Sequence, residues 1–499
     1  MTEQQHCIVE LTFGGTYALP VDNVPPVLVR FCHGTHAVVV PGFWDGETTY
    51  RVRFLPELVG TWTWRTEAER AGIRSASGAF TVLASAMRGA VRVAHRFHFA
   101  HADGTPFRPV GTTVYNWLHQ DEPVRRETVA AIAGAGFNKL RFLIFPQAGG
   151  YVEHEPTLMP FARDGGEWDV SAPSIPFFRQ LDAAVELLGA HGIQADVLIF
   201  NAYDRGHFGL NQLSAAEDDV YLRYLVARLS AYPNVWWSLC NEFDQLGRRP
   251  GRWHRVGALL AQLDPSAHVR SIHNWIELYD NNQDWVTHAS VQNGSATVDF
   301  GRASLYRDVW GKPVILDEIK YEGDIPERWG AISGRQLVHR FWVAAVSGCY
   351  ASHGESLSRN DGSLHVVAGG SLHGEAPARL GFLRDILDGL VVDGLDPIDK
   401  WDDPAFVAGA PRRQYLQYFG RSAPEQWSFR LPQGPLGERL MVGDAFDVDL
   451  IDTWHMTITS AGRRFTLTEV AANDAYDRAG PPLDLPAGQA LALRITRIE

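Results

Sequence analysis

Two apolar segments that end in carboxylates constrain this sequence most. Residues 235–244 (VWWSLCNEFD) begin with apolar or small side chains, typical of a buried strand, and then reach Asn241 and Glu242. Residues 313–319 (PVILDEI) form a second apolar run that ends in an Asp-Glu pair, with Glu318 as its second member. A (β/α)8 barrel places its reactive groups at the carboxyl ends of its strands. The two segments therefore predict a barrel with two acids at its mouth.

The central part of the chain alternates short apolar runs with amphipathic helical stretches, the pattern of βα units around a parallel sheet. Eight runs are predicted as strands: 107–113, 138–145, 194–200, 235–240, 268–273, 288–292, 314–317 and 349–353. Between them, Ser214 and Glu217 form a capping box that predicts a helix start. We therefore predict a (β/α)8 TIM barrel over residues 98–395. The alternative, a doubly wound sheet, lacks a GxGxxG turn after its first strand.

The two flanks look different from the centre. Within residues 1–97, alternation of apolar and polar side chains in 48–54 and 60–66, broken by Gly and Pro, predicts a β-sandwich. Residues 396–499 again show short strand-like runs and predict a second, C-terminal β-sandwich. The expected class is α/β, a TIM barrel with a sandwich on each side.

The net charge and the targeting patterns limit the classes of partner and the location that we expect. The net charge of −13 disfavours nucleic acid and anionic membranes as partners, since both need basic surface. No run reaches the roughly 18 apolar residues of a membrane span. The N-terminal residues lack a signal-peptide pattern, and the four cysteines are scattered, so we expect a cytoplasmic protein. A homo-oligomer remains possible.

Polar and aromatic side chains follow nearly every predicted strand. Amides, imidazoles, acids and indoles at strand ends suit a polyhydroxylated substrate, because they offer hydrogen bonds and stacking faces. The predicted substrate-binding residues are Asn116, Trp117, Arg141, Asn201, Asp204, Asn241, His273, Trp275, Gln292, His353 and Glu355.

Glu242 and Glu318 are the predicted catalytic pair, because strands four and seven lie roughly opposite each other across a barrel. Two carboxyl groups about 5–5.5 Å apart indicate a retaining glycosidase, and a wider gap indicates an inverting one. One carboxyl must hold its proton near neutral pH while the other stays ionised. Arg141 is a candidate donor to Glu318, and Asn241 could bind a substrate hydroxyl beside the scissile bond.

Other carboxylates are weaker candidates. Asp317, directly before Glu318, is expected to point away from the barrel axis and to have a structural role. Glu322 and Glu355 are possible substitutes for one of the catalytic pair. Residues 355–374, rich in Gly, Ser and His, form a long segment without a helix or strand pattern, which we interpret as a specificity loop.

Several motifs resemble a known family. Residues 103–107 (DGTPF) and 109–113 (PVGTT) are similar to the opening of the DUF4038 apiosidase-like barrels, and 316–323 (LDEIKYEG) resembles their strand-seven motif. The region around 61–64 (TWTW) resembles the DUF5060 sandwich, and the tail resembles DUF5605. Asn-Glu after strand four is typical of the clan of retaining (β/α)8 glycosidases.

The resemblance implies a retaining glycoside hydrolase, with Glu242 as acid/base and Glu318 as nucleophile. We expect this enzyme to work without a metal and without an organic cofactor. The cytoplasmic prediction favours a small oligosaccharide or a plant-type glycoside as substrate.

Two rival functions remain open. A metal-dependent hydrolase on the same barrel needs a tight His cluster, such as HxH after strand one, where this chain has Tyr115-Asn116-Trp117. His95, His98 and His101 are spaced by three, which sends successive side chains of a strand to opposite faces and disfavours a shared metal. The other rival is a non-catalytic carbohydrate-binding protein, against which the intact Glu242 and Glu318 argue.

Overall fold

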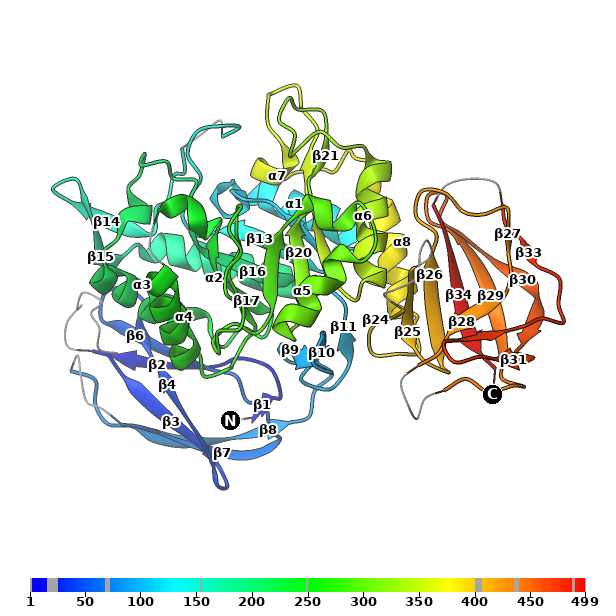
Figure 1. Cartoon of the computed structure of the whole chain (residues 1–499). Helices are drawn as coiled ribbons and strands as arrows, with labels where there is room; N and C mark the ends of the chain where they lie inside the picture. The colour runs from blue at the N-terminus through cyan, green and yellow to red at the C-terminus, as the bar shows by residue number, and fades with distance from the viewer. Residues whose placement is uncertain are drawn as a thin grey trace.

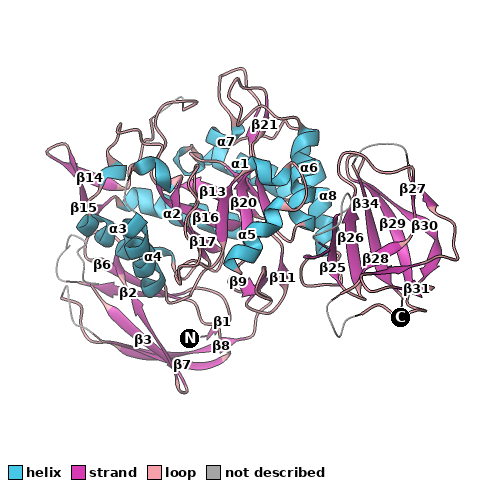
Figure 2. Ribbon diagram, in the orientation of Figure 1, coloured by secondary structure: helices cyan, strands magenta, loops and turns pink. Residues whose placement is uncertain are grey.

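The computed structural model shows a central barrel with strand-rich regions on two sides (Figures 1 and 2). The described residues are 2–15, 26–67, 72–152, 155–247, 250–399, 406–434, 439–486 and 490–498. The predicted fold class, a TIM barrel between two β regions, is confirmed. The boundaries placed after residues 97 and 395 stay a prediction.

The N-terminal region is built from two facing sheets. Its strands are β1 (Thr2–Gln4), β2 (Val9–Gly14), β3 (Leu28–His33), β4 (His36–Pro41), β5 (Phe43–Trp44), β6 (Thr49–Phe54), β7 (Gly60–Thr66) and β8 (Ser77–Leu83). One sheet has the order β1-β8-β7-β3-β4 and the other β2-β6-β5. Alternation along β7 buries Trp62 and exposes its neighbours. Trp62 and Phe31 pack against Phe54 of the second sheet, so the core lies between the sheets.

A small antiparallel sheet closes the bottom of the barrel. It consists of β9 (Val91–Ala94), β10 (His98–His101) and β11 (Pro106–Phe107). Phe99 and Phe107 lie 5.0 and 5.8 Å, between ring centroids, from Trp236 inside the barrel. The three aromatic rings seal the end of the barrel opposite its predicted mouth.

The barrel has eight parallel strands. They are β12 (Val110–Thr113), β13 (Lys139–Leu143), β16 (Gln194–Asn201), β17 (Val235–Asn241), β18 (Arg270–Ser271), β19 (Ala289–Gln292), β20 (Val314–Glu318) and β22 (Tyr350–His353). Their order is β18-β17-β16-β13-β12-β22-β20-β19, and a parallel bridge between His273 and Ser290 joins the two ends. Each of the eight predicted runs overlaps one of these strands, although β18 is shorter than expected.

Helices surround the barrel, as Figure 2 shows. They are α1 (Glu122–Gly134), α2 (Ile175–Ala190), α3 (Ala215–Leu229), α4 (Pro250–Leu263), α5 (Arg302–Trp310), α6 (Gly334–Val346), α7 (His365–Ala368) and α8 (Ala376–Asp388), with 3-10 turns η1 (Trp117–His119), η2 (Leu210–Gln212), η3 (Phe243–Leu246) and η4 (Gly294–Thr297). Ser214 and Glu217 form the predicted capping box at the start of α3, where it satisfies free backbone N–H groups. Among the described residues, no helix is long and apolar enough to cross a membrane.

Further short strands lie in the loops that connect the barrel elements. The hairpin β14 (Phe161–Asp164) and β15 (Glu167–Pro173) follows β13, and β21 (Glu322–Gly323) pairs with β23 (Glu355–Ser356). The segment 355–374 therefore contains a short strand and the α7 turn, so the prediction that it lacks regular structure is wrong.

The C-terminal region is a larger sheet faced by smaller ones. Its strands are β24 (Asp396–Asp399), β25 (Phe406–Ala410), β26 (Gln414–Tyr418), β27 (Gln426–Trp427), β28 (Arg430–Pro432), β29 (Ala445–Asp452), β30 (Thr457–Thr466), β31 (Glu469–Val470), β32 (Asp474–Tyr476), β33 (Leu483–Asp484) and β34 (Leu491–Arg497). Six of them form the order β24-β25-β26-β34-β29-β30. Tyr418 docks this sheet on α6, where it contacts His339 and Trp342.

A buried ionic junction joins the N-terminal sheets to the barrel. Asp182 on α2 accepts from Arg53 of β6 at 2.8 Å and from Arg228 of α3 at 2.7 Å. Arg228 also donates to Asp45 at 3.1 Å. All four side chains are less than a tenth exposed, so each charge depends on its partners.

Candidate active site

Glu242 stands at the point where β17 turns into η3. Its backbone has a left-handed φ of +52°, and its side chain is only 5% exposed. Gln245 donates to one carboxyl oxygen. Gln292, with its amide nitrogen turned toward Glu242, donates to the other oxygen at 2.9 Å. Burial, followed by the negative charge of Glu318, raises the pKa of Glu242 well above its usual range.

Glu318 is the last residue of β20 and has a different environment. The Tyr115 hydroxyl donates to Oε1 at 2.5 Å, Arg141 Nη1 lies 3.4 Å away, and His273 Nε2 lies 3.2 Å away. Burial raises the pKa of Glu318, but His273, Arg141 and Tyr115 together outweigh burial, so the net shift is downward.

The two carboxyl groups are therefore pushed in opposite directions. Glu242 holds its proton at neutral pH, and Glu318 stays ionised beside it. Two titratable groups with such opposed environments can act as an acid and a nucleophile in one site. The arrangement can deliver a proton to a leaving group while a carboxylate attacks or stabilises a positive centre.

A hydrogen-bond network ties the pair together. Arg141 Nη2 donates to Asn241 Oδ1 at 2.6 Å, and Asn241 donates to the Tyr203 hydroxyl at 2.7 Å. Tyr203 in turn lies 3.5 Å from the Tyr115 hydroxyl, which lies 3.2 Å from that of Tyr321. The structure thus brings the predicted residues Arg141, Asn241, His273 and Gln292 around Glu242 and Glu318.

The three tyrosines were not predicted as site residues. Tyr115 and Tyr203 do follow predicted strands one and three, and Tyr321 falls in the strand-seven motif, so their positions were visible in the sequence. Their direction toward the carboxyl pair depends on how the strand ends turn, which no residue pattern indicates.

Asp317 corrects one prediction. It points into the barrel rather than away from its axis. Lys139 Nζ lies 2.8 Å from Asp317 and 2.5 Å from Asp196, and Ser290 and Ser352 each donate to Asp317 at 2.6 Å. The expected structural role fits this fully buried ionic layer, which lies directly beneath the site.

Trp117 and His353 do not face the mouth of the barrel, contrary to prediction. Trp117 is fully buried in η1, and its indole N–H donates to the carbonyl of Arg125 at 3.1 Å. His353 contacts Thr112 at 2.9 Å and stacks on Phe137, and burial lowers its pKa to about 3. Both side chains point outward from the strand ends into the layer between the barrel and its helices.

Three further predicted residues shape loops at the mouth. Asn116 accepts from the backbone of Gln147 at 2.8 Å, Asn201 from Tyr203 at 2.7 Å, and Asp204 from Phe208 at 2.6 Å. Each side chain replaces a backbone partner in a turn, so these residues position the loops that surround the pair.

The two substitute carboxylates hold the start of α8. Glu322 accepts from the backbone N–H groups of Glu375 and Ala376 at 2.8 and 2.9 Å, and Glu355 accepts from those of His373 and Gly374. Carboxylates at a helix N-terminus satisfy free N–H groups. These bonds give both carboxylates a structural role and disfavour either as a replacement for one of the pair, and the substrate contact expected of Glu355 stays a prediction.

A loop with the exposed apolar side chains of Trp275, Ile276 and Leu278 lies beside Glu242. Asp244, two residues further on, accepts from the backbone N–H groups of Trp275, Ile276 and Glu277 at 2.6 to 2.7 Å. Trp275 is 47% exposed, Ile276 70% and Leu278 43%. Three hydrogen bonds to one carboxylate fix the loop that presents these apolar side chains.

The predicted specificity loop lines a pocket of about 560 Å³. Arg359, Asp361 and Ser363 of segment 355–374 line it together with Asn116 and Tyr151. Acidic, basic and hydroxyl groups mixed with apolar ones suit a polar organic molecule.

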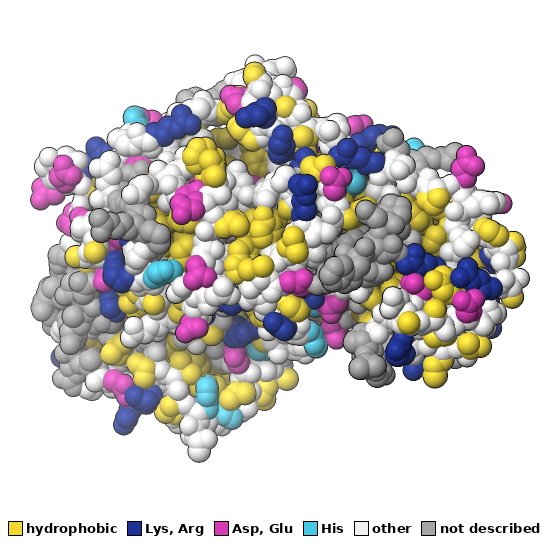
Figure 3. Space-filling view, in the orientation of Figure 1, with side chains coloured by type: hydrophobic (Ala, Val, Ile, Leu, Met, Phe, Trp, Pro, Cys, Tyr) yellow, Lys and Arg dark blue, Asp and Glu magenta, His cyan; other side chains and the backbone are white. Residues whose placement is uncertain are grey.

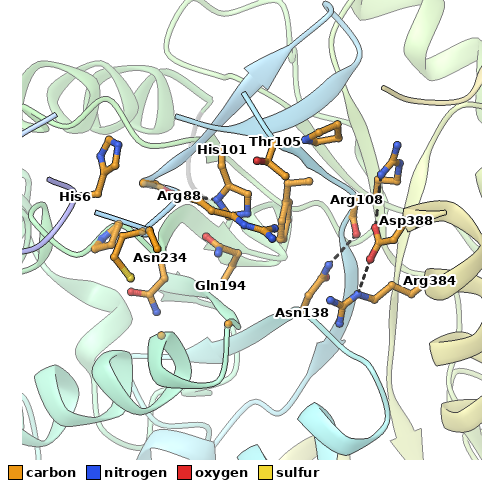
Figure 4. A pocket seen from close by; sticks show the side chains of 18 of the residues that line it. His6, Arg88, His101, Thr105, Arg108, Asn138, Gln194, Asn234, Arg384 and Asp388 are labelled. Atoms are coloured by element: carbon orange, nitrogen blue, oxygen red, sulfur yellow. Dashed lines mark hydrogen bonds and ion pairs between the residues drawn. The ribbon is translucent and has the colours of Figure 1, made fainter. Parts of the chain in front are cut away.

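A larger cavity of about 1060 Å³ lies at the opposite end of the barrel (Figure 4). Asn138, Gln194 and Asn234 line it near the starts of their strands. Asn138 and Asn234 already bond to neighbouring backbone, at 2.8 to 3.3 Å. This cavity is separate from Glu242 and Glu318, which lie at the strand ends.

The three histidines of the β10 region have separate partners. His98 contacts Tyr350 and Asp396, His101 contacts the carbonyl of Gly89, and His95 lies near Asp393. Over the part of the chain that the structure describes, no three His, Cys, Asp or Glu side chains are grouped so that they could hold a metal ion.

A barrel with two carboxyl groups at its strand ends is the architecture of many glycoside hydrolases, and comparisons with known proteins show that this chain is one. The model of the apiosidase-like catalytic domain matches residues 94–354, and the models of DUF5060 and DUF5605 match residues 2–69 and 401–496. The chain belongs to the apiosidase-like family.

Solved structures show the same architecture. A candidate glycoside hydrolase from Bacteroides vulgatus is 31% identical, with both chains covered completely and a TM-score of 0.93. A family 5 glycoside hydrolase from the same organism is 14% identical, with 82% of this chain and 93% of that chain covered and a TM-score of 0.59, which shows a shared fold. The search of curated proteins found no match.

Proposed function

We propose that this glycoside hydrolase cleaves its substrate with retention, through a covalent intermediate on Glu318. The observation that carries the proposal is the opposite shift of the two pKa values, upward for Glu242 and downward for Glu318. This division supplies the protonated acid and the ionised carboxylate that the reaction needs, and the choice of retention rests on the resemblance of the Asn241-Glu242 pair to the retaining (β/α)8 glycosidases.

In the first step, a Glu318 oxygen attacks the anomeric carbon, and the bond from that carbon to the leaving oxygen breaks. Glu242 gives its proton to the leaving oxygen. Glu242, now ionised, then removes a proton from water, whose oxygen attacks the anomeric carbon and releases Glu318. The first proton leaves with the departing alcohol and water supplies its replacement, so Glu242 and Glu318 end the cycle as they began and water is the only co-reactant.

The surrounding residues support these roles. Tyr115 and Arg141 direct hydrogen bonds at Glu318 and hold the carboxylate for in-line attack. Gln245 and Gln292 orient Glu242. Asn241, held by Arg141, can bind the substrate hydroxyl next to the scissile bond.

Two features of the structure support a substrate class. Glu242 protonates the leaving group, so the exposed Trp275 and Ile276 beside it lie on the leaving-group side. The pocket walled by segment 355–374 offers polar groups for further sugar hydroxyls. A small oligosaccharide or a plant-type glycoside fits this combination. The predicted cytoplasmic location and the possible homo-oligomer stay predictions.

The test compares wild type, Glu242→Gln and Glu318→Gln on a panel of nitrophenyl glycosides and small natural glycosides, with product anomers followed by NMR. The proposal is supported if both variants lose turnover of natural glycosides. It also requires that the product which the wild type forms first has the anomeric configuration of the substrate. Glu322→Gln is the matched control, because it changes a buried glutamate that binds only backbone N–H groups in this structure.

Inverted product would exclude the covalent intermediate, and full activity of both variants would exclude the assigned pair. A wild type that binds a sugar tightly without turning it over would favour the carbohydrate-binding alternative.

A further inference from the structure

His273 closes the barrel and connects two carboxylates. It is fully buried, and it makes the bridge to Ser290 that joins the last strands of the barrel. Its Nδ1 lies 2.8 Å from Ser290 Oγ, and its Nε2 lies 3.2 Å from Glu318 Oε1. Ser290 Oγ lies 2.6 Å from Asp317 Oδ2. The four groups form one chain from the ionic layer beneath the site to the carboxylate in it.

The positions of the protons in this chain follow from which groups can donate. Asp317 is ionised, because Lys139 and Arg141 hold its pKa far below the usual range despite its burial, and an ionised carboxylate only accepts. The one hydroxyl proton of Ser290 therefore goes to Asp317. Ser290 must then accept from His273, which requires a proton on Nδ1.

The other ring nitrogen faces Glu318. With Nδ1 already protonated, a neutral imidazole would leave an unprotonated, buried Nε2 that accepts no hydrogen bond and lies 3.2 Å from a carboxylate oxygen. A proton on Nε2 replaces that repulsion with the attraction of opposite charges. The same Glu318 oxygen accepts from Tyr115, which leaves the carboxylate ionised rather than protonated.

We propose that His273 is a permanent imidazolium, fixed by Asp317 through Ser290, and that it serves as a positioning residue for the Glu318 carboxylate. The proton on Nδ1 follows from the hydrogen-bond directions and the proton on Nε2 from the 3.2 Å distance to the ionised Glu318, whereas the purpose of that charge rests on the proposed role of Glu318 as nucleophile.

The charges around the ring favour this state. Glu318 contacts Nε2 directly, and Asp317 acts through one hydroxyl. Arg141 and Lys139 oppose a further cation, but Arg141 lies 3.4 Å from Glu318 and Lys139 lies 2.8 Å from Asp317, so each already faces a carboxylate. Tyr115 is neutral, since burial and Glu318 raise its pKa well above the usual range.

The positive charge of His273 contributes to both steps of the proposed reaction. Before attack, it stabilises ionised Glu318. When the glycosyl ester forms, Glu318 loses its charge and the imidazolium faces a neutral group. Departure of the Glu318 carboxylate in the second step restores the ion pair, so His273 assists the release of the sugar.

The direct test is the ¹⁵N NMR spectrum of the ring nitrogens in uniformly deuterated, ¹⁵N-histidine-labelled full-length protein. His273→Gln identifies the resonances by difference. We expect both nitrogens of His273 to carry protons at pH 7 and at pH 8. A neutral ring with one unprotonated nitrogen at pH 7 would overturn the proposal, whether or not the protein hydrolyses a glycoside.

Two serine variants test the link to Asp317. In Ser290→Ala, Nδ1 loses its acceptor, so we expect a neutral ring protonated on Nε2, and an acid limb of kcat/KM that moves up by about one pH unit. Ser290→Thr keeps the hydroxyl and should restore both the imidazolium signal and the pH profile. An unchanged imidazolium in Ser290→Ala would show that Asp317 and Ser290 do not fix it. Turnover that is absent on every glycoside, together with an imidazolium signal, would refute the proposed function alone.

Discussion

Removal of the Tyr115 hydroxyl tests the electrostatics of the site most directly. The hydroxyl donates to Glu318 Oε1 at 2.5 Å, and both side chains are less than a tenth exposed. A hydrogen bond to a charged group contributes about 1.5–3 kcal/mol. At about 1.36 kcal/mol per pKa unit, Tyr115→Phe should raise the pKa of Glu318 by about one to two units.

The sign of the pH effect follows from the lowered pKa of Glu318 in the folded protein. Ionised Glu318 is required for attack, so the acid limb of kcat/KM should move to higher pH by the same one to two units, with a smaller change near pH 7. The bond also stabilises the fold above the unfolded pKa of a glutamate, about 4.3, and this contribution is lost as the pH falls through the folded value.

The assay is kcat/KM from acid to neutral pH on an aryl glycoside that the wild type hydrolyses. Tyr321→Phe is the matched control, because its hydroxyl lies 3.2 Å from that of Tyr115 and reaches Glu318 only through it. The control should shift the acid limb less. Equal shifts in both variants, or no shift in Tyr115→Phe, would refute the reasoning.

Three other predictions concern separate parts of the molecule. Glu242→Gln should lose about 10²–10⁴-fold in kcat/KM on substrates with poor leaving groups, and much less on dinitrophenyl glycosides, which need no acid; equal losses on both would remove Glu242 from the acid role. Trp275→Ala should lower kcat/KM for an aryl glycoside about tenfold relative to the methyl glycoside of the same sugar, by the loss of about 1.4 kcal/mol of stacking; an unchanged ratio would place the leaving group elsewhere. Asp182→Ala leaves Arg53 and Arg228 buried without their shared partner, so urea unfolding should show a loss of about 3–5 kcal/mol; a loss under 1 kcal/mol would contradict the buried junction.

The barrel could be predicted from the sequence because its pattern is local. Each strand is a short apolar run, and each helix shows its own spacing or cap, as Ser214 and Glu217 do for α3. The ends of the strands mark the mouth, so Glu242, Glu318 and Arg141 could be placed from their positions alone.

The direction of individual side chains at the strand ends was not predictable in the same way. Asp317 was expected outside the barrel because strict alternation was counted back from Glu318, but the register between β19 and β20 shifts at this point. Trp117 begins η1 shortly after β12, and His353 is the last residue of β22, yet both enter the packing layer behind the barrel. Hydrogen bonds that cross the barrel, such as the one from Tyr115 to Glu318, connect residues far apart in sequence. They therefore produce no periodic pattern of residue types that could predict them.

The backbone conformation of Glu242 lowers the stability of the fold, whereas its carboxyl group is needed for the proposed activity. A left-handed φ in a residue other than glycine costs on the order of 1–3 kcal/mol, and a buried carboxyl adds to that cost. Replacement by glycine would relieve the backbone and remove the acid, giving a protein that is inactive and yet melts at a higher temperature. Selection for folding alone would therefore discard this glutamate, and only the demand for turnover retains it.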